Sequence, residues 1–158
     1  MARHRKAPLV GATIPLTHPL APGALDLLEW DLILRTGSNA LLEGPPLALK
    51  EAVSFLKPHL RTPHCIATGP RWALPSVEVG TLFLEYVDEC SIDQQHVLMD
   101  WVDGPAWAVQ VFTITERPLF EFVERGILLS PLYYRLNTIH LRLDVGLPSS
   151  RNRLLHLI

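Results

Sequence analysis

Long apolar runs are missing from this sequence. Runs such as Ile127–Leu129 and Leu82–Leu84 are far shorter than the roughly 20 apolar residues that a membrane-spanning helix needs. The N-terminus is basic from Arg3 to Lys6, but the apolar segment and small-residue cleavage site of a secretory signal do not follow. We therefore predict a cytoplasmic protein that does not span a membrane.

Cysteine and excess charge are also scarce. The two cysteines, Cys65 and Cys90, have no CxxC spacing, so we expect buried free thiols rather than a disulfide or zinc framework. The 14 basic and 16 acidic residues give a formal net charge of -2. Because proteins that bind duplex DNA usually carry a basic surface, this balance argues against direct DNA binding.

The sequence patterns of common metal and nucleophile sites are absent as well. The seven histidines show neither HxxxH nor HExxH spacing, so the helical zinc motifs are excluded. There is no G-x-S-x-G turn, and no Cys–His pair can be identified as nucleophile and base. We expect no metal site, with Glu85 at most a single metal ligand.

The sequence does contain enough apolar material for one globular domain, since 48% of its 158 residues are hydrophobic. Proline has a fixed φ and lacks a backbone N–H, and several prolines cluster near the N-terminus. We therefore predict an extended lead-in over residues 1–24 and a single domain over residues 25–158. The prolines of the lead-in are Pro8, Pro15, Pro19 and Pro22.

Short apolar runs alternate with helical patterns along the domain. Leu25, Leu28 and Leu32 recur at helical spacing, which predicts a helix over residues 25–34, and Gly37 suits the end of that helix. Strands that alternate with helices indicate an α/β fold with a parallel sheet and helices on both faces. The predicted strands are residues 40–42, 65–67, 81–87, 107–114 and 138–143.

Capping residues mark the starts of the later helices. Ser91 and Gln94 have the spacing of a capping box, in which each side chain satisfies a backbone donor near the other, and this helix should run to about Val102. Two further helices are predicted, one from Pro118 in the first turn to a point before Gly126, and one with Ser130 as N-cap and Pro131 at the first helical position.

Residues 80–89, G-T-L-F-L-E-Y-V-D-E, and residues 132–137, L-Y-Y-R-L-N, carry a resemblance to the AAA+ core of sigma-54-dependent, NtrC-type transcriptional activators. Residues 80–89, G-T-L-F-L-E-Y-V-D-E, resemble the family's G-T-L-F-L-D-E-I-x-E, and residues 93–98 resemble the D-x-Q-x-x-L-L helix that follows it. Residues 132–137, L-Y-Y-R-L-N, are similar to D-L-Y-Y-R-L-N in the same family. Shorter similarities occur in the family's order at residues 9–11, 39–44 and 147–153, so the resemblance covers nearly the whole chain.

The resemblance implies a Rossmann-like αβα sandwich with a parallel sheet of about five strands, the core of a P-loop NTPase. Two functional parts of the family have no counterpart in this sequence. The stretch between Phe55 and Thr81 is much shorter than in the family and lacks the G-A-F-T-G-A loop that touches the sigma factor. The sequence ends at Ile158, where the family continues into a helical lid and often a DNA-binding helix-turn-helix, so we expect neither.

The phosphate-loop region matches the family's motif only in part. A working loop reads G-x-x-x-x-G-K, because glycines let backbone N–H groups wrap around the phosphates. Pro45 and Pro46 remove two of these donors, and Leu49 replaces the second glycine. Lys50 is interpreted either as a residual phosphate contact or as an exposed lysine on the first turn of a helix. The residues retained from the motif are Gly44, Lys50 and Glu51.

The second nucleotide motif is altered at both of its acidic positions. The family's magnesium-binding Asp corresponds to Glu85, which is either a remaining metal ligand or a strand-end carboxylate bonded to backbone or solvent. The family's water-polarising Glu corresponds to Tyr86, whose phenol has an ordinary pKa near 10 and is poorly suited as a base at neutral pH. On the sensor strand, Thr113 or Thr115 stands where the family has an Asn, and neither is a clear replacement.

Arg135 corresponds to the second of two arginines that act on a neighbouring subunit's nucleotide in the family. The first arginine, within F-R-E-D, is lost, because residues 128–131 read L-L-S-P. Arg135 is interpreted either as such an arginine finger or as a helix arginine paired with a nearby carboxylate.

These residues predict a catalytically inactive AAA+-like domain, with no expected cofactor, that acts as a regulatory protein-interaction module in transcriptional regulation. The candidate partner is a full-length sigma-54 activator or a second copy of the chain. The alternative is a domain that binds ATP and magnesium weakly through Lys50, Glu85 and Arg135, with residual or no hydrolysis. A decaying gene product without a retained role also fits the sequence.

Overall fold

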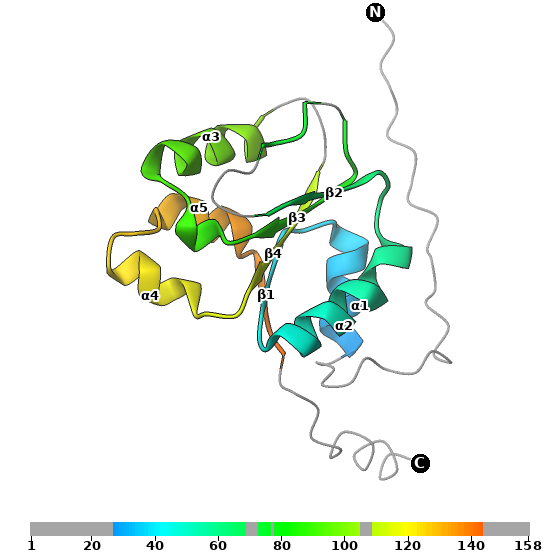
Figure 1. Ribbon diagram of the computed structural model, residues 1–158. Helices are drawn as coiled ribbons and strands as arrows, with labels where there is room; N and C mark the ends of the chain where they lie inside the picture. The colour runs from blue at the N-terminus through cyan, green and yellow to red at the C-terminus, as the bar shows by residue number, and fades with distance from the viewer. Residues whose placement is uncertain (1–26, 69–72, 77, 105–108, 144–158) are drawn as a thin grey trace, which may run out of the picture.

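The computed structural model describes residues 27–68, 73–76, 78–104 and 109–143, so the predicted lead-in lies outside the described residues. A five-stranded sheet forms the middle layer, and helices flank it (Figure 1). The helices are α1 (Leu27–Thr36), α2 (Pro46–Leu56), α3 (Ile92–Val102), α4 (Leu119–Glu124) and α5 (Ser130–Leu136), and the strands are β1 (Ala40–Glu43), β2 (His64–Ala67), β3 (Thr81–Glu85), β4 (Gln110–Thr115) and β5 (Ile139–Arg142).

All five strands are parallel and lie in the order β2-β3-β4-β1-β5. Strand β1 lies between β4 and β5, so that Leu41 has Thr113 beside it on one side and His140 on the other. Because parallel strands end at the same edge of a sheet, the residues that follow β1, β3 and β4 come together at that carboxyl edge. The predicted parallel sheet of about five strands is confirmed.

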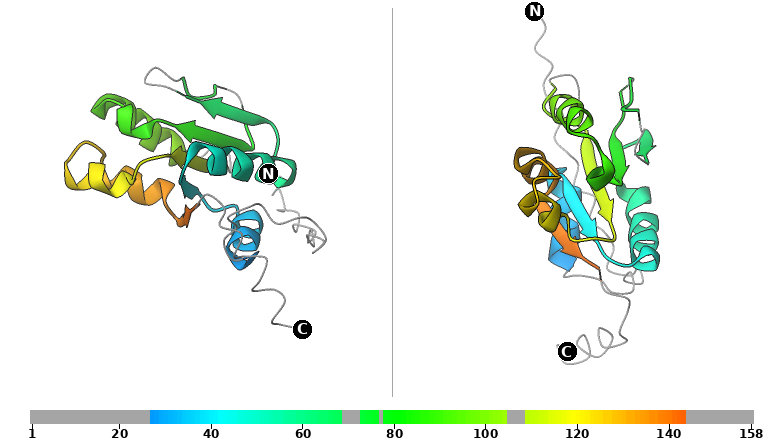
Figure 2. Two further views of the ribbon diagram at one scale, coloured as in Figure 1. Left: turned by 60° about the horizontal axis from the view of Figure 1, so that its bottom comes forward. Right: turned by 60° about the vertical axis from the view of Figure 1, so that its left-hand side comes forward.

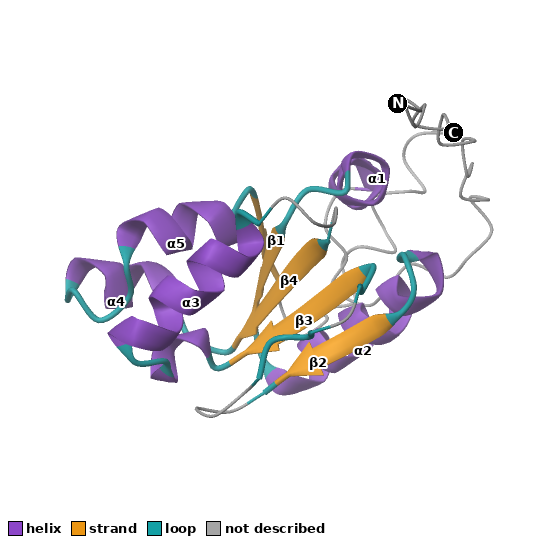
Figure 3. Ribbon diagram, turned by 90° about the horizontal axis from the view of Figure 1, so that it is seen from above, coloured by secondary structure: helices purple, strands orange, loops and turns teal. Residues whose placement is uncertain are grey.

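Side chains that alternate along a strand belong to two separate hydrophobic clusters, one on each face of the sheet. On β3, Phe83 belongs to the cluster under α1 and α2, whereas Leu82 and Leu84 belong to the cluster under α3, α4 and α5. This alternation is the two-residue period of a strand. Figures 2 and 3 show α2 on the opposite side of the sheet from α3, α4 and α5. Both faces carry helices, as expected for an all-parallel sheet and for the predicted αβα sandwich.

The capping box predicted at the start of α3 is confirmed. The backbone N–H of Gln94 donates to Ser91 Oγ at 3.2 Å, and the Ser91 N–H donates to Gln94 Oε1 at 2.9 Å. Helix α3 ends at Val102, as predicted. Two glycines follow helices in the left-handed conformation, Gly37 after α1 with φ 65° and Gly126 near the end of α4 with φ 69°. Such a conformation costs glycine little, which explains why these helices stop there.

Some predicted boundaries are wrong. Strand β3 ends at Glu85 instead of continuing to residue 87, because Tyr86 has a left-handed φ of 58° that breaks the extended backbone. A 3-10 turn over Val87–Glu89 follows. Strand β4 is Gln110–Thr115 rather than residues 107–114, and residues 105–108 lie outside the described residues.

Two predicted helix starts are also wrong by one position. Leu129 is the N-cap of α5, so Ser130 is already helical and Pro131 stands at the second position. Pro118 is the N-cap of α4 rather than a residue of its first turn. In both places the proline lies near the helix start as expected, and only the position of the N-cap residue differs.

The connection between β2 and β3 contains no helix in its described residues, which are 68, 73–76 and 78–80. Leu74 packs against the cluster under α3, and Trp101 Nε1 of α3 donates to the Pro75 carbonyl at 3.3 Å. This part of the chain therefore lies on the α3 side of the sheet. Both cysteines are free, as predicted, with Cys90 buried and Cys65 on β2 only partly buried.

Candidate functional site

Helix α2 begins where the sequence resemblance places the phosphate loop. Strand β1 ends at Glu43, and after Gly44 and Pro45 the chain is already helical from Pro46 onward. The Leu49 N–H is used inside the helix, because it donates to the Pro45 carbonyl at 3.0 Å. Pro46 has no N–H, so the first turn offers fewer donors than an ordinary helix start. The segment forms a helix turn instead of a loop that wraps around phosphates.

Packing explains the residues at both glycine positions of the motif. A Cβ at Gly44 would collide with the backbone carbonyl of Leu143, so a glycine is required where the chain after β1 passes the end of β5. Leu49 stands at the position of the second glycine, is only 5% exposed, and belongs to the cluster under α1 and α2. The retained glycine and the replaced glycine therefore both serve the hydrophobic core.

Lys50 is the fifth residue of α2, one position beyond the first turn in which we predicted it. It is exposed, and within the described residues its ammonium group makes no hydrogen bond or ion pair. Glu51 follows it and is partly exposed. The exposure of Lys50 agrees with the interpretation of a solvated helix lysine.

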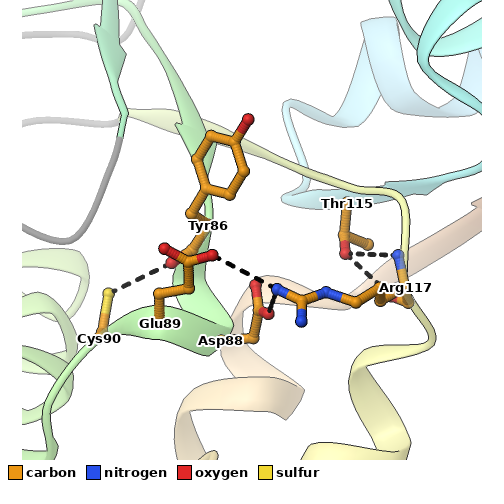
Figure 4. Close-up of polar contacts among 6 residues, drawn as sticks. All are labelled: Tyr86, Asp88, Glu89, Cys90, Thr115 and Arg117. Atoms are coloured by element: carbon orange, nitrogen blue, oxygen red, sulfur yellow. Dashed lines mark hydrogen bonds and ion pairs between the residues drawn. The ribbon is translucent and has the colours of Figure 1, made fainter.

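Glu85 and Tyr86 lie at the carboxyl end of β3. Glu85 is the last strand residue and is partly exposed, and Tyr86 is 46% exposed in the left-handed conformation, with φ 58° and ψ 38°. Figure 4 shows the Tyr86 ring pointing away from Asp88 and Arg117. The position that the resemblance assigns to a water-polarising carboxylate therefore holds an exposed phenol, which does not fit that chemistry.

An ion-pair cluster around Arg117 fixes the segment after β3, and our sequence interpretation missed it. The Arg117 guanidinium contacts the carboxylate of Asp88, whose side chain is 4% exposed, and lies 3.5 Å from Glu89 Oε1. Thr115 Oγ1 donates to the Arg117 carbonyl at 2.9 Å and accepts from its N–H at 3.1 Å (Figure 4). Glu89 and Arg117 are 28 positions apart, so no spacing rule could have paired them.

A cavity of about 660 Å³ lies between α2 and the carboxyl ends of β3 and β4, and we term it the α2–β3 cavity. It brings Lys50 together with Glu85 and Tyr86, which the sequence singled out separately. The Lys57 ammonium lies 5.7 Å from the centre of the Phe83 ring, within cation–π range. Other lining residues are Val53 and Ser54 of α2, Ile66 of β2, and Asp88, Ile114, Thr115, Glu116 and Arg117 around the carboxyl edge.

Thr113 and Thr115 lie on β4, the strand that corresponds to the resembling family's sensor strand. Neither presents an unengaged hydroxyl to the α2–β3 cavity. Thr113 is fully buried, and its hydroxyl has no hydrogen-bond partner within the described part of the chain. Its neighbours in the sheet, Leu41 and Leu84, both belong to the cluster under α3, α4 and α5. Thr115 lines the α2–β3 cavity, but its hydroxyl is occupied by the backbone of Arg117.

Arg135 does not line the α2–β3 cavity. Its Nε lies 2.7 Å from Oδ2 and 2.8 Å from Oδ1 of Asp103, which caps the end of α3, and its Nη1 donates to the Pro131 carbonyl at 3.1 Å. The hydrogen bond that Arg135 donates to the Asp103 carboxylate raises the pKa of Arg135 above its ordinary value. Arg135 is thus a helix arginine paired with a nearby carboxylate.

Tyr133, the residue two positions before Arg135, lies between two aromatic neighbours. Its ring centre is 5.7 Å from that of Phe120 and 5.3 Å from that of Tyr134. Burial raises the pKa of Tyr133 above its ordinary value of 10.0, and a hydrogen bond with Asn137 partly offsets this effect. The phenol therefore remains neutral well above physiological pH.

Metal clusters and membrane-spanning helices are both absent from the described residues. No group of three or more His, Cys, Asp or Glu side chains in this part of the chain is placed to hold a metal ion. No helix in the described ranges has the length and apolar character needed to cross a membrane.

No protein-family model and no curated protein matches the sequence, but solved structures share its fold. NtrX from Brucella abortus in complex with ATP has a TM-score of 0.57 and 16% identity over 74% of this chain and 35% of that chain. The P-loop NTPase domain of a sigma-54 transport activator from E. coli has a TM-score of 0.55 and 16% identity over 76% of this chain and 95% of that chain. A mutant of RuvB from Thermotoga maritima has a TM-score of 0.56 and 23% identity, over 74% of this chain and 42% of that chain.

The chain therefore has an α/β fold similar to that of these P-loop NTPase structures. The similarity to NtrX and to the sigma-54 activator domain agrees with the motif resemblance found at residues 80–89 and 132–137. The chain spans about a third of the NtrX chain that it matches. At these identities the likeness defines the fold and leaves the activity to be argued from the site.

Proposed function

We propose that this domain is an AAA+-like pseudoenzyme that has lost nucleotide chemistry and acts by binding another protein in transcriptional regulation. The observation that carries this proposal is the early start of α2. Because the helix begins at Pro46 and buries Leu49, the backbone has no loop with which to surround a phosphate group. The domain accordingly needs no nucleotide or metal cofactor, and its site of action is the cytoplasm.

The well-packed hydrophobic core supports a role for this domain in binding another protein. Both clusters contain fully buried side chains, including Phe83 and Leu82 on opposite faces of β3. The nucleotide motifs have changed while the packing of the sheet has been kept, and a fold that persists without its chemistry is maintained for its shape or surface. The proposed partner is a full-length sigma-54 activator, whose cores would pack against this one, and a second copy of this chain is the other candidate.

Weak ATP binding without efficient hydrolysis is the competing function. It is favoured by one observation, namely that Lys50 and Glu85 both line the α2–β3 cavity. Against it, Arg135 is paired with Asp103, Tyr86 has replaced a carboxylate, and α2 occupies the place of the loop. An arginine finger would first have to leave this ion pair, in which Arg135 Nε contacts both carboxylate oxygens of Asp103.

Co-expression with a sigma-54 activator from the same cell tests the proposed function. We expect the two proteins to co-purify and the output of a sigma-54 promoter to fall, because a subunit without a working nucleotide site would interrupt the activator's assembly. The matched control is Leu82→Asp, which places a carboxylate at a fully buried position and should unfold the domain. If the native chain neither associates nor changes promoter output, the activator is not its partner.

A further inference from the structure

The α2–β3 cavity combines an open apolar wall with unpaired carboxylates. Ile66 of the edge strand β2 is 53% exposed, whereas the neighbouring strand β3 is buried from Thr81 to Leu84. Glu85 and Glu116 line the carboxyl edge of the cavity, and within the described residues neither carboxylate makes a hydrogen bond or an ion pair. Asp88, the third acidic lining residue, is already paired with Arg117.

These features favour a peptide that carries cations next to apolar side chains. Cations would lie against Glu85 and Glu116, and an apolar side chain would cover Ile66. Lys50 of α2 and Lys57, which begins the 3-10 turn after α2, line the side of the cavity and would repel a second cation there. The charges therefore fix the orientation of a bound segment, with its basic end at the carboxyl edge.

The lead-in of this chain has this chemistry within eight residues. Residues 3–10 read R-H-R-K-A-P-L-V, so three fixed cations are followed, after Ala7 and Pro8, by two larger apolar side chains. The other basic terminal segment contains Arg151 and Arg153 but continues from β5, which is separated from β3 by β4 and β1. Of the two segments, the lead-in has more cations and the closer match to the cavity.

The lead-in is followed by α1, which lies on the same face of the sheet as α2. Helix α1, which follows it, packs with α2 in one cluster, and the Trp30 and Phe55 rings lie 5.9 Å apart. The 16 residues from 11 to 26 can extend over about 55 Å, which exceeds the width of a small domain. A tethered segment meets its site at an effective concentration in the millimolar range, so even a contact with a Kd of about 1 mM would be half occupied.

We propose that residues 3–10 of the lead-in dock in the α2–β3 cavity of the same chain, with Arg3, Arg5 and Lys6 against Glu85 and Glu116 and with Leu9 or Val10 over Ile66. Docking of this segment does not depend on whether the domain binds nucleotide or an activator. It makes the cavity a peptide-binding surface that another protein can use only by displacing the lead-in.

Carbodiimide cross-linking of the full-length chain, read by mass spectrometry, tests this docking because the reagent joins an amine directly to a contacting carboxylate. We expect Lys6 to be joined to Glu85 or Glu116. The chain is cross-linked at low concentration and mixed with an equal amount of isotope-labelled chain, so that links within one copy can be told from links between copies. Links from Lys50 or Lys57 to cavity carboxylates report that the reagent reaches the site.

The double variant Arg3→Glu with Arg5→Glu keeps Lys6 as the reporter and should lower the yield of its link several-fold. The matched control, Arg151→Glu with Arg153→Glu, makes the same charge change at the other end and should leave the yield unchanged. Three results would each overturn the proposal: Lys6 joined only to carboxylates outside the cavity, links chiefly between labelled and unlabelled copies, or equal yields in the two variants.

Discussion

The carboxylate of Asp88 is almost fully buried, and its charge is balanced by a single guanidinium. Arg117 contacts this carboxylate and also binds Glu89 and the turn after β4. A buried charge that loses its partner keeps its desolvation penalty, whereas an exposed ion pair contributes little. The Arg117 cluster therefore stabilises the 3-10 turn after β3, directly after the position that the sequence resemblance assigns to a water-polarising carboxylate.

Replacing Arg117 by alanine should lower the free energy of unfolding by about 2 kcal/mol, because Asp88 would remain buried without a counter-charge. Urea denaturation measures this change. The control is Arg35→Ala, which removes an exposed ion pair with Asp31 within α1 and should cost about 0.5 kcal/mol or less. Equal losses in the two variants would show that the buried pair contributes no more than a surface pair.

Tyr133 should give the domain a stability that decreases at alkaline pH. Burial raises the pKa of Tyr133 above 10.0, so the folded protein holds this proton more tightly than the unfolded chain does. The resulting stabilisation is fully present below pH 10 and is lost as the pH rises through the raised pKa. Tyr133→Phe should flatten this part of the stability profile and remove the latest phase of tyrosinate absorbance, while Tyr134→Phe should leave the decline in place.

At the scale of single elements, α2 packs into the core a residue that stands at a glycine position of the resembling family's phosphate loop. Leu49 and Leu47 lie in the same helix two residues apart, yet Leu49 is 5% exposed and Leu47 is 59% exposed. Restoring a glycine at position 49 would therefore remove a buried side chain from a helix. A glycine at position 49 would restore this part of the motif but would destabilise helix α2.

The variant Leu49→Gly should lose about 4 kcal/mol of stability, the sum of a buried leucine truncation and a glycine inside a helix. Leu47→Gly makes the same chemical change at an exposed position and should lose about 1 kcal/mol. Thermal and urea unfolding followed by circular dichroism measure both. Comparable losses would mean that Leu49 is not a core residue and that the loop region is not helical in solution.

The elements that the sequence predicted best are those governed by local rules. The Ser91–Gln94 capping box and the strand at Thr81 follow from hydrogen bonding and apolar patterning among near neighbours. The end of β3 could not be predicted, because the left-handed backbone of Tyr86 is unusual for an aromatic residue. The N-cap of α5 was also predicted wrongly, because the actual N-cap, Leu129, has no polar side chain that could mark it in the sequence.

The candidate site was predicted only in its parts. Lys50, Glu85 and Tyr86 were found through their motif positions, and the structure brings all three to one cavity. The pairing of Arg117 with Asp88 depends on how β3 and β4 end next to each other, which no spacing in the sequence reveals. The predicted lead-in over residues 1–24 and the strand residue Trp107 lie outside the described residues.

At the scale of the whole molecule, the parallel sheet with helices on both faces resembles the fold of the P-loop NTPase structures, and the differences from the family's nucleotide motifs lie at the carboxyl edge. This edge is where open α/β sheets bind their ligands. There, a helix turn stands in place of the loop after β1, an exposed phenol follows β3, and an ion pair joins the segments after β3 and β4. We therefore expect a molecule that keeps the family's shape and lacks its nucleotide.

Nucleotide binding separates the pseudoenzyme from its competing function most directly. The measurement is the thermal unfolding midpoint of the full-length chain with and without millimolar ATP and magnesium, supported by titration calorimetry. A ligand at 100 times its Kd stabilises a folded protein by about 2.7 kcal/mol, which corresponds to a shift of several degrees for a domain of this size. We predict an unchanged midpoint and no binding heat. A reproducible upward shift of several degrees, with a matching calorimetric isotherm, would contradict the loss of nucleotide binding.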